Sequence, residues 1–126
     1  YDWLNKTKSE FKDSDFLKLY IDFKREELVQ RIMIRTIKML KEGAIEEVKR
    51  FIKLKIKKDN SVNKAIGINE IKEFLNHEKE LSDIKEKISI KTRQYAKRQS
   101  TWARGNMASW FKLQPKEINK FLKKFK

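Results

Sequence analysis

The sequence TRQYAKRQSTWAR, residues 92–104, is the last part of a long helical pattern that starts at Leu81. At about 100° per residue, one side of such a helix carries apolar and aromatic residues: Ile84, Ile88, Tyr95 and Trp102. The opposite side carries cations: Arg93, Lys97 and Arg104. The pattern therefore predicts a helix over residues 81–104, with Ser82 near its cap, one face that packs and one face that can hold phosphate. A plain solvated basic face has the same pattern.

The residues before this helix are also mostly helical in pattern. An amphipathic helix is predicted over residues 24–54, interrupted at Gly43. Its apolar side carries Leu28, Val29, Ile32, Met33, Met39 and Leu40. A polar connection with an Asp-Asn-Ser turn signal leads to a short helix over residues 68–75. After the long helix, Pro115 is expected to start a tail helix, because proline is favourable in a first helical turn.

Two short segments have the pattern of strands. Residues 16–23 alternate with a period of two, and residues 107–113 form the other candidate strand, with Trp110 and Phe111 expected in the core. Two short strands far apart in the sequence do not make a stable sheet alone. We therefore expect that both belong to a sheet whose other strands are absent, or that they pair only with each other. A lead-in helix is expected over residues 3–11.

The composition is strongly basic. The chain has 32 Lys and Arg against 18 Asp and Glu, which gives a net charge of +14 in 126 residues. Such a charge attracts polyanions in a salt-dependent way, but it does not distinguish RNA, DNA and an acidic membrane. No apolar run approaches the roughly 20 residues that span a bilayer, so we expect a soluble protein with no membrane partner. The chain has no cysteine, which excludes disulfides and thiolate metal sites and is compatible with a cytoplasmic location.

Four motifs, in order along the chain, resemble those of the tRNA dimethylallyltransferases, the IPP transferase family. These enzymes prenylate an adenosine beside the tRNA anticodon. The motifs are residues 28–32 with Arg35, Met39, Leu40 and Gly43; residues 65–67 with Glu70; residues 92–99 with Thr101, Trp102 and Arg104; and Trp110 with Phe111. Ile68 and Asn69 depart from the family pattern, which usually has Tyr and Lys there. The resemblance runs from residue 1 to about residue 113.

The resemblance implies a fold that is mostly α with one or two β-strands. It would be the C-terminal portion of an α/β P-loop-type transferase whose N-terminal sheet and phosphate loop are absent. Residues 1–113 would be the last part of the catalytic domain, and residues 114–126 a basic C-terminal helix. No sequence of the type G-x-x-x-x-G-K-[ST] occurs in the chain, and the family's catalytic aspartate and its threonine near the diphosphate have no counterpart. We therefore expect this chain alone to be catalytically inactive.

The reaction that the resemblance implies is transfer of a dimethylallyl group from dimethylallyl diphosphate to N6 of the adenosine 3′ of the anticodon. Arg35 aligns with the family's channel arginine, which would stabilise the charge that grows on the departing diphosphate. Its place at the margin of the apolar stripe predicts a partly desolvated guanidinium. The alternative is an arginine whose stem packs on the core while its head reaches water. Mg²⁺ is also implied by the family, but this chain offers no ligand for it.

The predicted macromolecular partner is a tRNA anticodon stem-loop, bound by an enzyme that is expected to be a monomer. Two segments match the family's tRNA-contacting residues: Ser61, Val62, Asn63, Lys64, Ala65 and Ile66, and Ile90, Lys91, Thr92, Arg93, Gln94, Tyr95, Ala96 and Lys97. The four cations of this set would hold phosphates, and Thr92 and Gln94 would donate to sugar or base groups. Tyr95 and Trp102 either pack in the core or stack on bases. Arg98 either contacts RNA or braces a neighbouring helix.

A different class of function fits the charge equally well. A freestanding basic helical module that binds RNA or DNA would also carry the exposed cations Arg93 and Lys97. Such a module has no reason to carry four family motifs in their family order. The ordered motifs therefore favour the transferase, and the non-catalytic module remains the alternative.

Overall fold

The structure is a computed structural model that describes residue 8 and residues 10–125. It divides into two compact units, Lys24–Asn106 and the segments on either side of it. This division differs from the boundary expected at residue 113, which concerned the limit of the catalytic domain and stays a prediction. Of the lead-in helix expected over residues 3–11, only residues 8, 10 and 11 are described, and none of these is helical.

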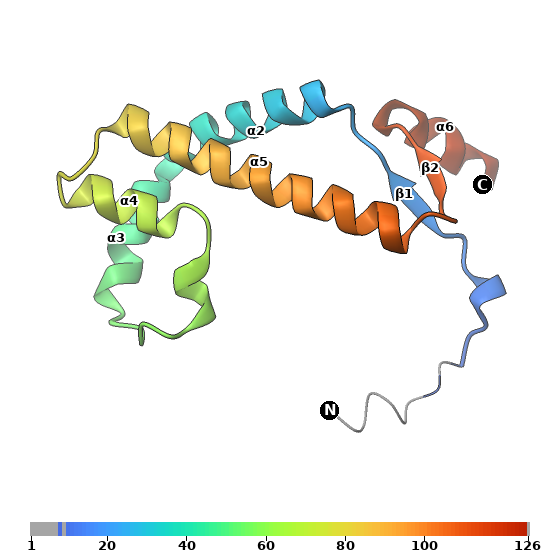
Figure 1. Cartoon of the computed structure of the whole chain (residues 1–126), viewed down its shortest axis with the longest axis horizontal. Coiled ribbons are helices and arrows are strands. Elements are labelled where there is room, and N and C mark those ends of the chain that lie inside the picture. Colours follow the sequence, from blue (N-terminus) through green and yellow to red (C-terminus); the bar gives the residue numbers. More distant parts are fainter. Residues whose placement is uncertain (1–7, 9, 126) are drawn as a thin grey trace. The chain divides into compact units, whose positions relative to one another are not determined.

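The helical unit begins with a long helix that changes direction at a glycine. Helix α2 (Arg25–Met39) is followed by a π-helical turn over Leu40–Ala44 and by α3 (Ile45–Lys53). Gly43 lies in this turn with a φ of +113°, a conformation that side-chain-bearing residues rarely adopt. The predicted interruption at Gly43 is therefore found, and α3 leaves the line of α2 there (Figure 1).

Two further helices complete this unit. Helix α4 (Ile68–Leu75) has the predicted bounds, and α5 (Leu81–Asn106) is two residues longer than predicted. Helix α5 packs against α2 and α4, and α4 also contacts α3. The centre of the core is formed by one or two side chains from each of α3, α4 and α5: Val48, Ile71, Ile84 and Ile88. The predicted cap of α5 was wrong: the helix begins at Leu81, and the Asp83 carboxylate accepts from the Glu80 N–H at 3.3 Å, which places the cap at Glu80, two residues before Ser82.

Some residues on the predicted apolar sides of α2 and α5 lie outside the buried core. Met33 of α2 is 51% exposed, and Tyr95 and Trp102 of α5 are 50% and 58% exposed. The place predicted for Met33 on the packed side was wrong for this chain, and of the two alternatives left open for Tyr95 and Trp102, packing in the core is not found. The reason lies in the neighbours: α3 and α4 lie along the first part of α5 and bury Ile84 and Ile88, but they do not reach its second part (Figure 1).

The second unit contains a small parallel sheet. Strands β1 (Leu19–Ile21) and β2 (Phe111–Leu113) pair in parallel, with Leu19 opposite Phe111. Among the described residues they pair only with each other, and each is shorter than predicted, although Lys18 and Asp22 beside β1 still form backbone hydrogen bonds with Phe111 and Leu113. Leu113 is buried, whereas Phe111, which was expected in the core, is exposed and stacks on Phe121 at 5.5 Å between ring centroids.

The tail after β2 is helical, as predicted, but in short pieces. A 3₁₀ turn over Pro115–Glu117 precedes α6 (Ile118–Leu122) and a second 3₁₀ turn over Lys123–Phe125. Glu117 accepts from the Gln114 N–H at 2.8 Å, which caps the first of these pieces.

Candidate functional site

A pocket of about 520 Å³ in the helical unit brings together residues from three separate sequence motifs. Its walls come from α2, from the loop before α4, and from α5. The lining residues are Ile32, Arg35, Thr36, Met39, Lys64, Ala65, Ile66, Ile88, Thr92, Tyr95 and Arg98. The structure thus places around one space the predicted channel arginine, half of the predicted RNA-contacting loop, and three residues of the motif at residues 92–99, which lies on α5 and is called the signature helix below.

The charge of this pocket is positive. Arg35, Lys64 and Arg98 line it, and none of its lining residues is acidic. Within the part of the chain that the structure describes, none of these three cations forms an ion pair. Cations without a neighbouring carboxylate raise the local concentration of anions, so the pocket is suited to phosphate groups.

Arg35 is exposed and lies between two pockets. Besides the first pocket, it lines a second one of about 550 Å³ at the Gly43 bend, together with Lys38 and Arg50 and three glutamates, Glu42, Glu46 and Glu47. The predicted partial desolvation of its guanidinium is not found in this chain, because Arg35 is exposed. Its stem starts beside buried Ile32 and Thr36, so the interpretation of a packed stem and a free head fits the geometry better.

Two threonines of the pocket use their hydroxyl hydrogens inside their own helices. Thr36 is buried, and its Oγ1 donates to the carbonyl of Ile32 at 2.9 Å. Thr92 donates to the carbonyl of Ile88 at 2.8 Å. The predicted donation from Thr92 to RNA therefore competes with a helix bond, whereas its oxygen can still accept, for example from a ribose hydroxyl. Sequence reasoning missed Thr36, whose signal is a polar residue within the apolar stripe of α2.

An aromatic side chain and an arginine stand together at the α5 wall. The Arg98 guanidinium carbon lies 5.6 Å from the centroid of the Tyr95 ring, and both residues are exposed. This distance is in the range of a cation–π contact. Stacking of Tyr95 on a base stays a prediction. Arg98 was not placed in the site from the sequence, although its spacing of three residues from Tyr95 puts it on the same side of a helix.

The predicted RNA-contacting loop is folded by its own side chains. Ser61–Lys64 forms a 3₁₀ helix in which the Asn60 side chain accepts from the Val62 N–H at 3.1 Å. Asn63 donates through Nδ2 to the carbonyl of Lys57 at 2.8 Å. Lys64, Ala65 and Ile66 reach the pocket, whereas Ser61, Val62 and Asn63 are not among its lining residues.

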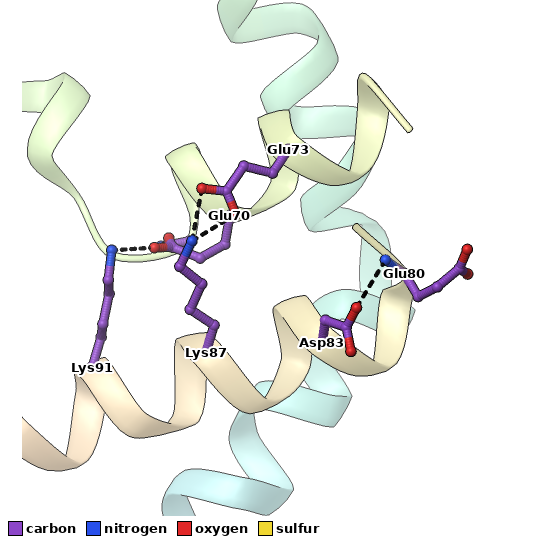
Figure 2. A network of polar contacts seen from close by, with 7 residues as sticks. Glu70, Glu73, Glu80, Asp83, Lys87 and Lys91 are labelled. Atoms are coloured by element: carbon purple, nitrogen blue, oxygen red, sulfur yellow. Dashed lines mark hydrogen bonds and ion pairs between the residues drawn. The ribbon is translucent and has the colours of Figure 1, made fainter. Parts of the chain in front are cut away.

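A buried carboxylate holds the end of this loop. Glu70 is 1% exposed, and its Oε2 accepts from the Gly67 N–H at 2.9 Å while its Oε1 forms an ion pair with Lys91 of α5 (Figure 2). Burial raises the pKa of Glu70, but the bonds from Lys91 and Gly67 outweigh it, so the pKa lies below its ordinary value. Lys91 as a phosphate contact stays a prediction, and its partner in this structure is Glu70.

Comparison with known proteins identifies the family of this chain. A family model described as IPP transferase matches residues 1–106. The chain belongs to the IPP transferase family. It is 64% identical, over its whole length, to a protein of Pelagibacter ubique named tRNA dimethylallyltransferase. The chain spans 40% of that relative.

Solved structures of IPP transferases have the same fold over most of this chain. The tRNA isopentenylpyrophosphate transferase of Bacillus halodurans matches 89% of the chain with a TM-score of 0.71 and 28% identity, and the chain covers 35% of it. The tRNA delta(2)-isopentenylpyrophosphate transferase of Staphylococcus epidermidis matches 87% with a TM-score of 0.74 and 28% identity, and the chain covers 39% of it. The predicted family and the predicted fold class, a mostly helical portion of this transferase fold, are confirmed.

The remaining predicted contacts of this IPP transferase chain lie along α5 outside the pocket. Arg93, Gln94 and Lys97 are exposed, and Ile90 and Ala96 are half-buried. No acidic residue occurs in the sequence between Glu86 and Glu117, so this part of α5 keeps a positive surface. The predicted helix contacts therefore separate into a pocket group, Thr92 and Tyr95, and an outer group of exposed polar residues.

The described part of the chain contains no group of three or more His, Cys, Asp or Glu side chains placed to hold a metal ion. The Mg²⁺ that the family implies stays a prediction. None of the helices in this described part is both long enough and apolar enough to cross a membrane.

Proposed function

We propose that this chain forms the tRNA-binding and leaving-group part of an enzyme that prenylates tRNA. The complete enzyme would transfer a dimethylallyl group from dimethylallyl diphosphate to N6 of the adenosine 3′ of the anticodon. The observation that carries this proposal is the convergence of Arg35, Lys64 and the α5 residues Thr92, Tyr95 and Arg98 on one positively charged pocket. The name of the Pelagibacter ubique relative supports it.

The chemical step needs positive charge at the leaving group. The N6 atom attacks the allylic carbon, the carbon–oxygen bond breaks, the diphosphate leaves with the electron pair, and N6 loses a proton. The guanidinium of Arg35 would stabilise the charge that grows on the diphosphate oxygens, because a planar fork of donors matches phosphate geometry. Arg98 and Lys64 flank the same space and would add to that field.

The proton from N6 needs an acceptor that this pocket does not contain. None of its lining residues is an aspartate, a glutamate or a histidine. The acceptor would then come from a part of the enzyme outside this chain, which spans 40% of the Pelagibacter relative. For this reason we propose that the chain binds RNA but does not transfer the prenyl group unaided.

Recognition of the RNA would use the loop and the signature helix. The target base has to leave its stack before N6 can be reached, and unstacked bases in loops are read through their faces and edges. Tyr95 presents an exposed ring at the pocket wall on which a neighbouring base can stack. Lys64 from the loop, and Arg93 and Lys97 on the outer side of α5, would hold phosphates.

The test uses an active enzyme that carries this chain. We would replace the matching segment of the Pelagibacter ubique relative by these 126 residues and measure prenyl transfer to an anticodon stem-loop. Arg35→Ala is expected to lower kcat about 100-fold or more while the RNA still binds. Arg31→Ala is the matched control, because Arg31 lies one turn away on α2, pairs with Glu27 and is not among the pocket residues.

Three results would contradict the proposal. A chimera that melts normally and binds the stem-loop without any transfer would leave only the RNA-binding module. Equal kcat values for Arg35→Ala and the unmodified chimera would remove Arg35 from the reaction. Transfer by the isolated chain would show that no outside residue is needed to accept the proton.

A further inference from the structure

The carboxylate of Glu70 connects two elements that both line the pocket, the loop before α4 and helix α5. One oxygen accepts from the backbone N–H of Gly67, where the loop meets α4, and the other pairs with Lys91, which lies on α5. Glu70 itself is buried in the first turn of α4 (Figure 2). A single buried group thus receives a hydrogen bond from the loop and a charge from the signature helix.

The other hydrogen bonds of the loop at this point are made within the backbone: the Ala65 carbonyl accepts from the Ile68 N–H at 3.3 Å, and the Gly67 carbonyl accepts from the Ile71 N–H at 2.9 Å. Gly67 has a φ of +107°, and its preceding residues Lys64, Ala65 and Ile66 are exposed although they line the pocket. A Cβ at Gly67 would lie 3.9 Å from the Met39 side chain and 4.0 Å from that of Ile88, so the backbone here already runs close to the core. The Glu70 carboxylate adds to these local bonds a tie from the end of the loop to a side chain that is itself held from α5.

A second ion pair between the same two helices provides a comparison. Lys87 of α5 donates to both carboxylate oxygens of Glu73 of α4 at 2.7 Å (Figure 2). This pair also ties α4 to α5, but among the described residues the Glu73 carboxylate accepts from Lys87 and from no loop residue, and its side chain is 29% exposed compared with 1% for that of Glu70. The two pairs differ in the feature that matters here, the bond to Gly67.

From these contacts we infer that Glu70 is a positioning residue of the pocket, held from α5 by Lys91, and that it fixes the loop residue Lys64 relative to Thr92 and Tyr95 of α5. The consequence for RNA binding and transfer rests on the function proposed above. The consequence for the loop does not, because it follows from the hydrogen bonds alone. The role assigned to Lys91 is thereby indirect: it neutralises Glu70, and the phosphate contacts are left to Lys64, Arg93 and Lys97.

The chemistry of the pair supports this role. A buried carboxylate without its cation has to bind a proton or draw in water, and either change disturbs the bond to Gly67. Glutamine at position 70 would keep an oxygen that accepts from Gly67 but would lose the charge. Alanine would lose both. The two substitutions therefore separate the backbone bond from the ion pair.

The experiment compares both pairs in the chimera described above. For Glu70→Ala we expect KM for the stem-loop to rise about tenfold, with a smaller change in kcat, because a charge-assisted bond that orders the RNA-contacting loop is lost. Glu70→Gln should recover part of this loss. Glu73→Gln and Lys87→Met, which also loosen α4 from α5, should leave KM within about twofold, in line with a partly exposed ion pair.

Hydrogen exchange of residues 61–67 is the second readout, and it needs no activity. Glu70→Ala should speed exchange in this segment more than Glu73→Gln does at an equal loss of thermal stability. The inference is overturned if the two variants raise exchange and KM equally, or if Glu70→Ala changes neither. If the unmodified chimera does not transfer, the proposed function has failed, and the exchange measurement alone decides whether Glu70 positions the loop.

Discussion

The two halves of α5 carry the same pattern but have different surroundings. In the first half, Ile84 and Ile88 are buried, and Lys87 and Lys91 each pair with a glutamate of α4. In the second half, the aromatic residues Tyr95 and Trp102 are exposed, and among the described residues none of the cations forms an ion pair. A helical period therefore identifies a face, whereas the neighbouring elements decide whether that face is buried.

The largest difference between the halves is expected in stability. Ile84→Ala removes a completely buried side chain and should lower the free energy of unfolding of the 126-residue chain by about 2–5 kcal/mol. Tyr95→Ala is the control from the same stripe of α5 and should cost less than about 1 kcal/mol, because half of its surface is already in water. Urea unfolding measures both. Equal costs would mean that the second half of α5 is covered in this chain.

A smaller difference is expected between the two lysines of the first half. Lys91→Met leaves the buried Glu70 without its cation and should cost about 1–3 kcal/mol, less than a fully buried pair because the Lys91 side chain is 44% exposed. Lys87→Met should cost about 0.5–1 kcal/mol, since Lys87 and Glu73 are both partly exposed. Thermal unfolding of the two variants, with Glu70→Gln added to each, separates the pairs. The added change should relieve Lys91→Met but not Lys87→Met, and the reverse order would contradict the assignment.

Much of the local structure could be predicted from the sequence. The helix over Ile68–Leu75 has its predicted bounds, and Gly43 marks the bend after α2, because periodicity and glycine act over a few residues. The strands were predicted too long, since an alternating pattern such as that of residues 16–23 does not show where pairing with a distant strand begins and ends. Whether Tyr95 and Trp102 pack in the core could not be decided from the sequence for a related reason: burial depends on elements that are distant in sequence.

The sequence predicted several residues of the candidate site but not the contacts between them. The family motifs named Arg35, Lys64, Thr92 and Tyr95, and the structure places these four around one pocket. The ion pair between Glu70 and Lys91 could not be read from the sequence, because the two residues are 21 positions apart and lie on different helices. Arg98 could have been included, as it follows Tyr95 by three residues on the same helix.

Acid should act on the first half of α5 in a defined direction. The pKa of Glu70 lies below its ordinary value because the bonds from Lys91 and Gly67 outweigh the effect of burial. A carboxylate whose folded pKa is lowered stabilises the fold above its unfolded pKa, ordinarily about 4.3, and this contribution is lost as the pH falls through the folded pKa. Below the ordinary range, the unmodified chain should therefore lose more stability than Glu70→Gln, as thermal unfolding between pH 7 and pH 3 can show. Parallel curves would contradict the assignment of this step to Glu70.

The smallest effect concerns the outer cations of the second half, and it separates direct contacts with RNA from indirect ones. A lysine or arginine that touches a phosphate releases counterions, so its loss should lower the slope of log affinity against log salt by about 0.7–0.9. Arg93→Met and Lys97→Met should each do this for the anticodon stem-loop, since both side chains are exposed and have no acidic partner among the described residues. Lys91→Met should weaken binding without changing the slope, because its charge already neutralises Glu70. A slope that falls equally in all three variants would make Lys91 a phosphate contact and would return it to the outer face of α5.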